Sequence, residues 1–264
     1  MVQLPSRFDP EVSHTLERLA ARAWPADEVH DVEGWLLRRT DGVDRRRCNS
    51  LLPPADDAHA RRTLDLALAT AAELDVVASV QVSPAEAHLG LDDALAAMGG
   101  VSGGASLVIA GPAPGAAAPA PSAGGSAVPY AIEGGPLTAE WVEAWADVSG
   151  LDGTRETAEL VLSQLSVRGQ FCAATDAATG APLAVGLGVA EDGWLGIFSL
   201  ATTPAVRRRG LASAVVDHLE RWGATRGARR SYLQVEADNE PALRFYARRG
   251  FHVAHSYHYR TLKP

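Results

Sequence analysis

The segment "SLATTPAVRRRGLASAVVDHL" spans Ser199 to Leu219 and places three arginines and a glycine directly before an apolar helical pattern. Leu211, Val215 and Leu219 recur every four residues and so lie on one stripe of a helix. The N-terminus of a helix carries unpaired N–H groups and partial positive charge, which makes it an anion site. Gly210 lets the backbone itself reach an anion. We interpret this strand–turn–helix as a phosphate-binding loop, with a solvated basic turn as the alternative.

The loop differs from two common nucleotide-binding motifs. No Gly-Lys-Ser/Thr follows Gly210, so it is not a Walker loop. The dinucleotide fingerprint is excluded as well, because it requires G-x-G-x-x-G and an acidic residue about 20 positions later. The sequence therefore predicts a ligand with phosphate groups but neither of these two binding modes.

The composition excludes several functional classes. The chain has 264 residues, an apolar fraction of 47% and a formal net charge of −8, which argues against a general nucleic-acid or membrane binder. Cys48 and Cys172 are its only cysteines, so neither a disulfide framework nor a structural zinc site is expected. No signal peptide and no apolar run of about 18 residues is visible. We expect a cytoplasmic protein, monomeric or homodimeric, without metal, nucleic acid or membrane partners.

One biased segment divides the chain. "AGPAPGAAAPAPSAGGSAVP", from Ala110 to Pro129, alternates Pro, Ala, Gly and Ser and cannot bury a core. An ordered surface loop is the alternative to a linker. We predict a first domain over residues 1–111, a linker over 112–128 and a second domain over 129–264.

Both predicted domains alternate strands with helices. After a helix over 11–25, the first domain reads β-β-α-β-α-β, with elements expected at 34–39, 45–53, 56–74, 76–83, 90–98 and 105–111. The second domain reads α-α-β-β-β-α-β-α-β, with elements expected at 138–150, 154–169, 170–175, 182–190, 193–203, 211–222, 230–237, 240–250 and 251–262. The shared β-α-β-α-β ending predicts an internal duplication. The expected fold class is α/β (α+β), with a mixed central sheet flanked by helices.

A second motif follows the strand "YLQVEA". Asn239 precedes a helical pattern, and Tyr246 comes seven residues later, which is two helical turns. An amide at the helix entry and a phenol two turns further along can therefore face one ligand. The alternative is an N-cap asparagine and a tyrosine buried in the core.

Together the two motifs resemble those of the GNAT superfamily of N-acetyltransferases, over roughly residues 130–264. "SLATTPAVRRRGLASAVVDHL" is similar to its acetyl-CoA motif, with Ala212 in place of the commoner glycine, and "LQVEADNEPALRFYARRGF" to its strand-Asn-helix-Tyr segment. The resemblance implies that the backbone of Leu200, Ala201 and Thr202 pairs with the pantetheine arm, and that a bulge near Leu200 polarises the thioester. It implies that the amides from Arg208 to Ser213 hold the pyrophosphate and that Asn239 contacts the pantetheine end. The full expected cofactor set is Leu200, Ala201, Thr202, Arg207, Arg208, Arg209, Gly210, Leu211, Ala212, Ser213 and Asn239.

The resemblance also implies the chemistry. Acetyl-CoA would donate its acetyl group to a primary amine of a small molecule or peptide by direct attack in a ternary complex. Tyr246 would protonate the departing thiolate, which suits a phenol with a pKa near 10. The glutamate that some relatives carry five residues before the asparagine is Gln234 here, so Glu236, on the same strand face, is the candidate base. Glu236 as a solvated residue is the alternative. The rival function is a non-catalytic acyl-CoA-binding regulatory module.

The first domain is expected to be a degenerate GNAT-like module. The stretch that corresponds to the phosphate loop, "LLPPADDAHARR", has Asp56 and Asp57, whose charges repel pyrophosphate. We therefore expect no CoA there. The basic stretch over 34–50 either contributes to the acceptor site or is purely structural.

Overall fold

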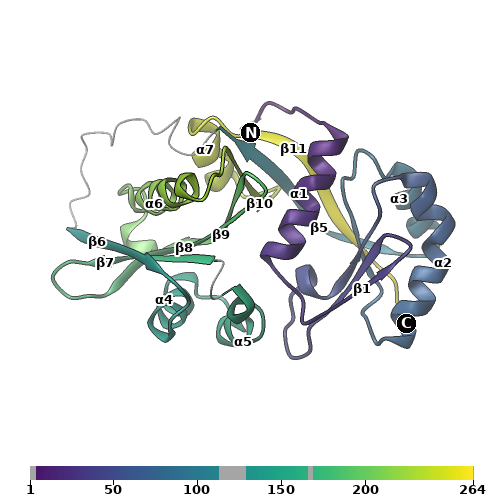
Figure 1. The fold of residues 1–264 in the computed structure, drawn as a ribbon, viewed down its shortest axis with the longest axis horizontal. Helices are drawn as coiled ribbons and strands as arrows, with labels where there is room; N and C mark the ends of the chain where they lie inside the picture. The colour runs from purple at the N-terminus through teal and green to yellow at the C-terminus, as the bar shows by residue number, and fades with distance from the viewer. Residues whose placement is uncertain (1–3, 113–128, 166–168, 264) are drawn as a thin grey trace. The chain divides into compact units, whose positions relative to one another are not determined.

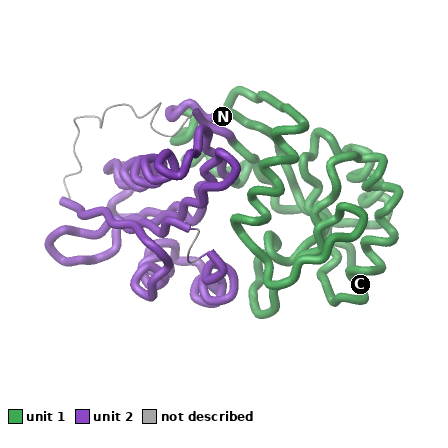
Figure 2. Tube along the Cα trace, viewed as in Figure 1, with its two compact units in different colours: residues 1–109, 234–247, 252–264 green, residues 110–233, 248–251 purple. Residues whose placement is uncertain are grey.

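The computed structural model describes residues 4–112, 129–165 and 169–263, and these form two compact units (Figures 1 and 2). Unit 1 comprises residues 1–109, 234–247 and 252–264, and unit 2 comprises 110–233 and 248–251. Apart from Pro112, the expected linker lies outside the described residues. The units group residues by contact in space, so strand β10 (Arg230–Glu236) contributes residues to both. The sequence-based domain boundaries stay a prediction.

The sheet of unit 1 is mixed and draws on both ends of the chain. Its strands follow the order β1 (Glu28–Val32), β2 (Trp35–Arg39), β3 (Ser50–Leu52), β4 (Ser79–Val82), β11 (His252–Thr261) and β5 (Val101–Gly111). β3 and β4 are parallel, whereas β11 pairs antiparallel with β4, His258 opposite Val82. The last strand of the chain therefore completes the sheet of the N-terminal unit.

The helices of unit 1 cover opposite faces of this sheet. Val80 and Val82 of β4 join an apolar core with Leu64 of α2 (Asp57–Glu73) and Leu91 of α3 (Leu89–Ala97). Between them, Gln81 hydrogen-bonds to Glu17 of α1 (Pro10–Ala23). Successive side chains of a strand point to opposite faces. α1 therefore lies on the polar face of β4, and α2 and α3 lie on its apolar face.

The strands of unit 2 are also of mixed direction. Its strand order is β10, β9 (Trp194–Thr202), β8 (Pro182–Glu191), β7 (Gly169–Asp176) and β6 (Tyr130–Gly135). β10 runs parallel to β9, and the other neighbours are antiparallel. The α/β fold with mixed sheets and flanking helices is thus confirmed.

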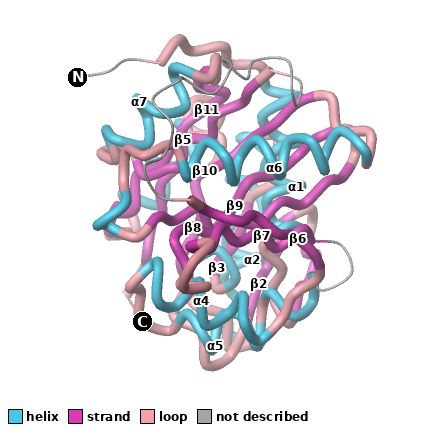
Figure 3. Tube along the Cα trace, turned by 90° about the vertical axis from the view of Figure 1, so that its left-hand side faces the viewer, coloured by secondary structure: helices cyan, strands magenta, loops and turns pink. Residues whose placement is uncertain are grey.

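Helices cover both faces of the unit 2 sheet. α6 (Leu211–Thr225) lies beside β6 to β9 in Figures 1 and 3, with α4 (Ala139–Ser149) and α5 (Thr154–Leu160) on the other side. Gly186 of β8 allows α6 to approach, because a Cβ at this position would meet Val215 at 2.7 Å. On α4, the Trp141 indole donates to the Cys172 carbonyl of β7 at 3.0 Å. These contacts pack α6 against β8 and α4 against β7.

The expected elements differ from the structure in four places. The helix expected over 154–169 ends at Leu160, and a 3-10 turn follows over Leu162–Leu165, whose buried leucines have the three-residue spacing of that helix type. The strand expected over 45–53 is a 3-10 turn, Arg46–Cys48, followed by the short β3. β1 and β6 were not predicted. Both are edge strands with largely exposed side chains, so their sequences carry little apolar signal.

Candidate functional site

Strand β9 contains a bulge where the family resemblance implied one. Val185 pairs with Ala201 but Leu187 pairs with Phe198, so β9 has one more residue than β8 in this interval. Ser199 has a φ of +50°, the left-handed region that non-glycine residues seldom adopt. The bulge lies next to Leu200 and bends the end of the strand.

Beyond the bulge, β9 is paired on one side within unit 2. Ala201 and Thr202 pair with β8, whereas the described ladder between β9 and β10 covers only Trp194–Gly196. The other backbone edge of Leu200–Thr202 therefore does not pair within the described part of unit 2. Such an edge is suited to an extended ligand that adds like a strand.

The turn after β9 presents the N-terminus of α6. A 3-10 turn over Pro204–Val206 leads to Arg207, whose Nε donates to the Thr202 carbonyl at 3.2 Å. Arg208 has a φ of +63°, an unfavourable conformation for a residue with a Cβ. Gly210 has a φ of +84° and is the N-cap of α6. No side-chain hydrogen bond caps the helix at this position. Backbone alone therefore forms the mouth of the helix.

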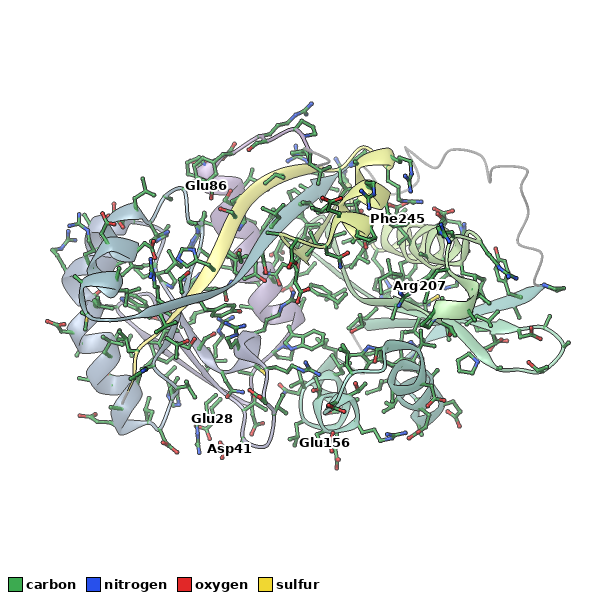
Figure 4. All side chains as sticks on the ribbon, turned by 180° about the vertical axis from the view of Figure 1, so that it is seen from behind. Glu28, Asp41, Glu86, Glu156, Arg207 and Phe245 are labelled. Atoms are coloured by element: carbon green, nitrogen blue, oxygen red, sulfur yellow. The ribbon has the colours of Figure 1, made fainter. Side chains whose placement is uncertain are left out.

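This helix mouth is open and surrounded by positive charge. A Cβ built on Gly210 would have no heavy atom within 4 Å. The three arginines before it are exposed, and Figure 4 labels Arg207 at this turn. An uncapped helix N-terminus with nearby cations is a favourable place for a diphosphate. The residues present thus fit the pyrophosphate group that the sequence resemblance implies.

The corresponding helix of unit 1 has a closed N-terminus. The Asp56 Oδ1 accepts a hydrogen bond from the His59 amide at 2.6 Å, which caps α2. The Asp57 carboxylate accepts from the Leu91 amide at 2.8 Å and from Arg61 at 3.0 Å. Two carboxylates therefore occupy the place where an anion would bind.

Asn239 and Tyr246 lie at the start and in the body of α7 (Glu240–Arg248). The Asn239 Oδ1 accepts from the Ala242 amide at 3.2 Å, so the asparagine caps the helix. Capping uses only the oxygen, so the exposed side-chain amide can still donate to a ligand. Tyr246 is buried, and its ring meets that of Phe245, labelled in Figure 4, edge-on at 4.9 Å.

The two residues considered for the base differ in exposure. Glu236 is exposed at the end of β10, whereas Gln234 is half-buried. Gln234 lines a small cavity of unit 1, of about 10 Å³, with Glu17, Arg38, Arg47 and Gln81. The sequence analysis did not predict that Glu17 is buried and lines this cavity. The available signal was its position on the same face of α1 as the buried Ser13, Leu16 and Ala20.

Glu17 belongs to a buried polar network. Its Oε1 accepts from the His255 Nε2 at 2.6 Å, and its Oε2 accepts from the Gln81 amide at 2.9 Å. Arg38 donates to the Gln81 Oε1 and to the Ser50 hydroxyl, both at 2.7 Å. Burial by itself raises the pKa of the Glu17 carboxyl, but the hydrogen bond and charge of His255 outweigh this and lower it below its usual value. The carboxylate is therefore held ionised.

Both cysteines are poor nucleophiles. Burial raises the pKa of Cys172 to about 12, and burial also raises that of Cys48. The thiolate is the reactive form of cysteine, so neither residue is activated at neutral pH. Among the described residues, no group of His, Cys, Asp and Glu side chains is arranged to hold a metal ion. Within the same residues, no helix has the length and apolar character needed to cross a membrane.

The fold and the α6 turn define a class: an α/β protein in which a bulged strand leads into a helix whose N-terminus begins at a glycine. The model of the acetyltransferase (GNAT) family matches residues 138–251. An uncharacterized N-acetyltransferase of Bacillus subtilis, YobR, is 26% identical over 246 residues, covering 93% of this chain and 96% of that protein.

Two solved structures share the whole architecture. A GCN5-related N-acetyltransferase from Kribbella flavida aligns with a TM-score of 0.65 at 17% identity, over 97% of this chain and 96% of that one. A tandem GNAT protein from the clavulanic acid biosynthesis pathway aligns with a TM-score of 0.62 at 13% identity, over 94% and 88%. Residues 138–251 thus match the GNAT acetyltransferase family, the Bacillus relative that spans nearly the whole chain is named an N-acetyltransferase, and the fold is tandem GNAT-like.

Proposed function

We propose that this protein transfers the acetyl group of acetyl-CoA to a primary amine of a small molecule or a peptide. The observation that carries the proposal is the uncapped N-terminus of α6 at Gly210, which directly follows the bulged end of β9. Acetyl-CoA, when bound, supplies an activated thioester, and its acetyl group passes directly to the amine in a ternary complex.

Unit 2 supplies the groups proposed to hold the CoA moiety. The backbone edge of Leu200–Thr202 that does not pair within the described part of unit 2 would receive the pantetheine amides. The amides from Arg208 to Ser213 would bind the pyrophosphate, and Arg207 to Arg209 would add positive charge. The backbone N–H at the Leu200 bulge would polarise the thioester carbonyl.

The segment from β10 to α7 supplies the groups proposed to contact the pantetheine end and to move protons. Asn239 would donate to the pantetheine end, and the Tyr246 hydroxyl would give its proton to the sulfur as the C–S bond breaks. The exposed Glu236 carboxylate is the candidate acceptor, through a water, of the proton that the amine loses. The high pKa values of Cys172 and Cys48 support direct transfer, because a covalent acetyl-cysteine requires a thiolate.

The test is thiol release from acetyl-CoA with a panel of amines: spermidine, glucosamine, free amino acids and a lysine-containing peptide. We expect turnover with at least one amine, and a loss in kcat of about 100-fold in Tyr246→Phe with an unchanged Kd for acetyl-CoA. Tyr130→Phe, on the exposed edge strand β6, is the matched control and should retain full activity. Stabilisation by acetyl-CoA without turnover of any amine would instead indicate a regulatory acyl-CoA-binding module.

A further inference from the structure

Arg46 of unit 1 combines solvent exposure with a fixed position. It is the first residue of the 3-10 turn Arg46–Cys48, and its side chain is exposed. Its guanidinium lies over the ring of the buried Tyr259, with 4.9 Å between the guanidinium carbon and the ring centroid. A guanidinium stacked on an aromatic face presents its N–H donors in a defined plane. The side chain is therefore preorganised for a ligand that comes from solvent.

Two glycines of β5 make room for this side chain. A Cβ on Gly104 would lie 2.9 Å from one guanidinium nitrogen of Arg46, and a Cβ on Gly103 would lie 3.6 Å from the other terminal nitrogen. Gly104 also has a φ of +68°, which residues with a Cβ seldom adopt. β5 lies between β11 and β10 in the strand order. The guanidinium thus extends from Tyr259 of β11 over β5, in the direction of β10.

The positive charge of Arg46 is not neutralised by the protein. Arg39 of β2 forms salt bridges with Glu28 and Asp41. No side chain among the described residues, by contrast, forms a salt bridge or a hydrogen bond with the Arg46 guanidinium. A guanidinium offers five N–H donors in a planar fork, which matches the geometry of an oxyanion such as a carboxylate or a phosphate. Arg46 therefore has the charge and the donors to bind one.

Arg46 and the candidate base Glu236 lie on the same face of the unit 1 sheet. Tyr259, below the guanidinium, is paired with Gln81 of β4, and paired residues of neighbouring strands share a face. Gln81 and Gln234 line one small cavity, so Gln234 of β10 is on this face as well. Side chains two residues apart on a strand point the same way, which places Glu236 beside them.

A backbone hydrogen bond sets the distance between the two charged groups. The Ala237 amide donates to the Ala105 carbonyl at 3.0 Å, so the residue after Gly104 is next to the residue after Glu236. Adjacent strands are about 4.8 Å apart and residues along a strand about 3.3 Å, so Gly104 and Glu236 lie within about 10 Å of each other. All four of these residues are exposed. One small ligand on this surface can therefore reach both Arg46 and Glu236.

We propose that Arg46 binds an oxyanion of the acceptor, which is therefore an amine that also carries a carboxylate or a phosphate. The amine lies toward the Glu236 carboxylate and the oxyanion lies on the Arg46 guanidinium, so each charge of the acceptor meets one of opposite sign. The basic stretch over 34–50 then contributes to the acceptor site through this one residue. The inference rests on the proposed function, since that function supplies the amine.

The experiment measures binding without turnover. Twenty L-amino acids and their carboxamides, and the pair phosphoethanolamine and ethanolamine, are titrated into the full-length protein in the presence of CoA. Binding is followed by calorimetry or ligand-observed NMR. We expect at least one amine with an oxyanion to bind at least tenfold more tightly than its uncharged counterpart, as one hydrogen bond to a charged group provides. The amino-acid pairs report on a carboxylate, and the ethanolamine pair reports on a phosphate.

Variants assign this preference to Arg46. In Arg46→Met the ratio of the two affinities should fall to within threefold of unity, and in Arg46→Glu, which reverses the charge at an exposed position, it should fall below one. Arg62→Met is the matched control, because it removes an exposed charge of the same unit from α2, on the opposite face of the sheet, and it should keep the wild-type ratio. No preference in the wild type, a preference that survives in either Arg46 variant, or an equal loss in Arg62→Met would overturn the subsite.

The outcome is separable from that of the proposed function. Oxyanion-bearing amines that bind through Arg46 but are never acetylated would leave the subsite intact and remove the acetyl transfer. Efficient acetylation of amines with no oxyanion preference would do the reverse. If both hold, Arg46→Met should raise the KM for the acceptor and leave the KM for acetyl-CoA unchanged, which a general loss of folding would not do.

Discussion

Replacing Gly210 by alanine tests whether the N-terminus of α6 binds acetyl-CoA. A Cβ at this position would meet no heavy atom within 4 Å, so the substitution introduces no clash. Its cost is that of holding a non-glycine residue at a φ of +84°, about 1–2 kcal/mol. Gly193→Ala is the matched control, because Gly193 lies in the same unit, has a φ of +77° and is equally free of neighbours. Without ligand, we expect both variants to lose similar stability in urea unfolding.

With acetyl-CoA the two variants should separate. If the alanine shifts the N-terminus of α6 so that one backbone hydrogen bond to the pyrophosphate is lost, acetyl-CoA binding should weaken by about tenfold. At a concentration about 100 times the wild-type Kd, the ligand stabilises the wild type by about 2.7 kcal/mol. The same concentration would stabilise Gly210→Ala by only about 1.4 kcal/mol. Gly193→Ala should keep the full stabilisation.

Unfolding with and without acetyl-CoA, supported by calorimetric Kd values, measures both effects. Equal acetyl-CoA affinity in Gly210→Ala and Gly193→Ala would refute the assignment of the pyrophosphate to this turn. A loss of affinity in both variants would show that general destabilisation of unit 2 is enough to weaken acetyl-CoA binding. The assignment of the pyrophosphate to the Gly210 turn would then fail as well.

Three further substitutions test the packing of the units. Arg249→Met should cost about 3–5 kcal/mol in urea unfolding, because it leaves the buried Glu220 carboxylate without the guanidinium 2.9 Å away; a loss below 1 kcal/mol would contradict this. The hydrogen bond from Arg260 is the main cause that lowers the pKa of Asp92 in the folded state, so this carboxylate stabilises the fold above its unfolded pKa, near 3.8. Asp92→Asn should therefore be destabilising at pH 7, and its difference from the wild type should shrink as the pH falls below 3.8 and through the lower pKa of the folded state; a constant difference would exclude the linkage. The Thr138 Oγ1 caps α4 by accepting a hydrogen bond from the Trp141 amide at 3.2 Å. Thr138→Ala removes this cap and should lower the free energy of unfolding by about 1 kcal/mol; an unchanged melting temperature would contradict this.

The sequence carried the features that depend on neighbouring residues. Gly210 lies directly before an apolar helical stripe, and this is a local signal in the sequence. The structure places it, with a positive φ, at the N-cap of α6. Asn239 is likewise recognisable as the residue between a strand and a helix. The bulge near Leu200 followed from the family resemblance, and a register shift between β8 and β9 is present there.

Features that depend on distant pairing were not predictable in the same way. The antiparallel partner of β4 is β11, about 180 residues later in the chain, and no local pattern indicates this register. Glu17 reads as a polar residue of an amphipathic helix, and only the fold shows that it is buried against His255, 238 positions away. The Gln234 cavity is assembled from five separate segments, so its charge balance is a property of the fold alone.

The two helix N-termini differ in a way that would let one of them bind an anion and prevent the other from doing so. At α6 a glycine in the left-handed region leaves the helix amides uncapped, whereas at α2 the Asp56 carboxylate takes the position of an anion. The loss of that site does not make unit 1 dispensable. His255, on the last strand, is fully buried and donates its Nε2 hydrogen to Glu17 of the first helix. The first and last elements of the chain thus fold as one body, so unit 1 depends on both ends of the sequence.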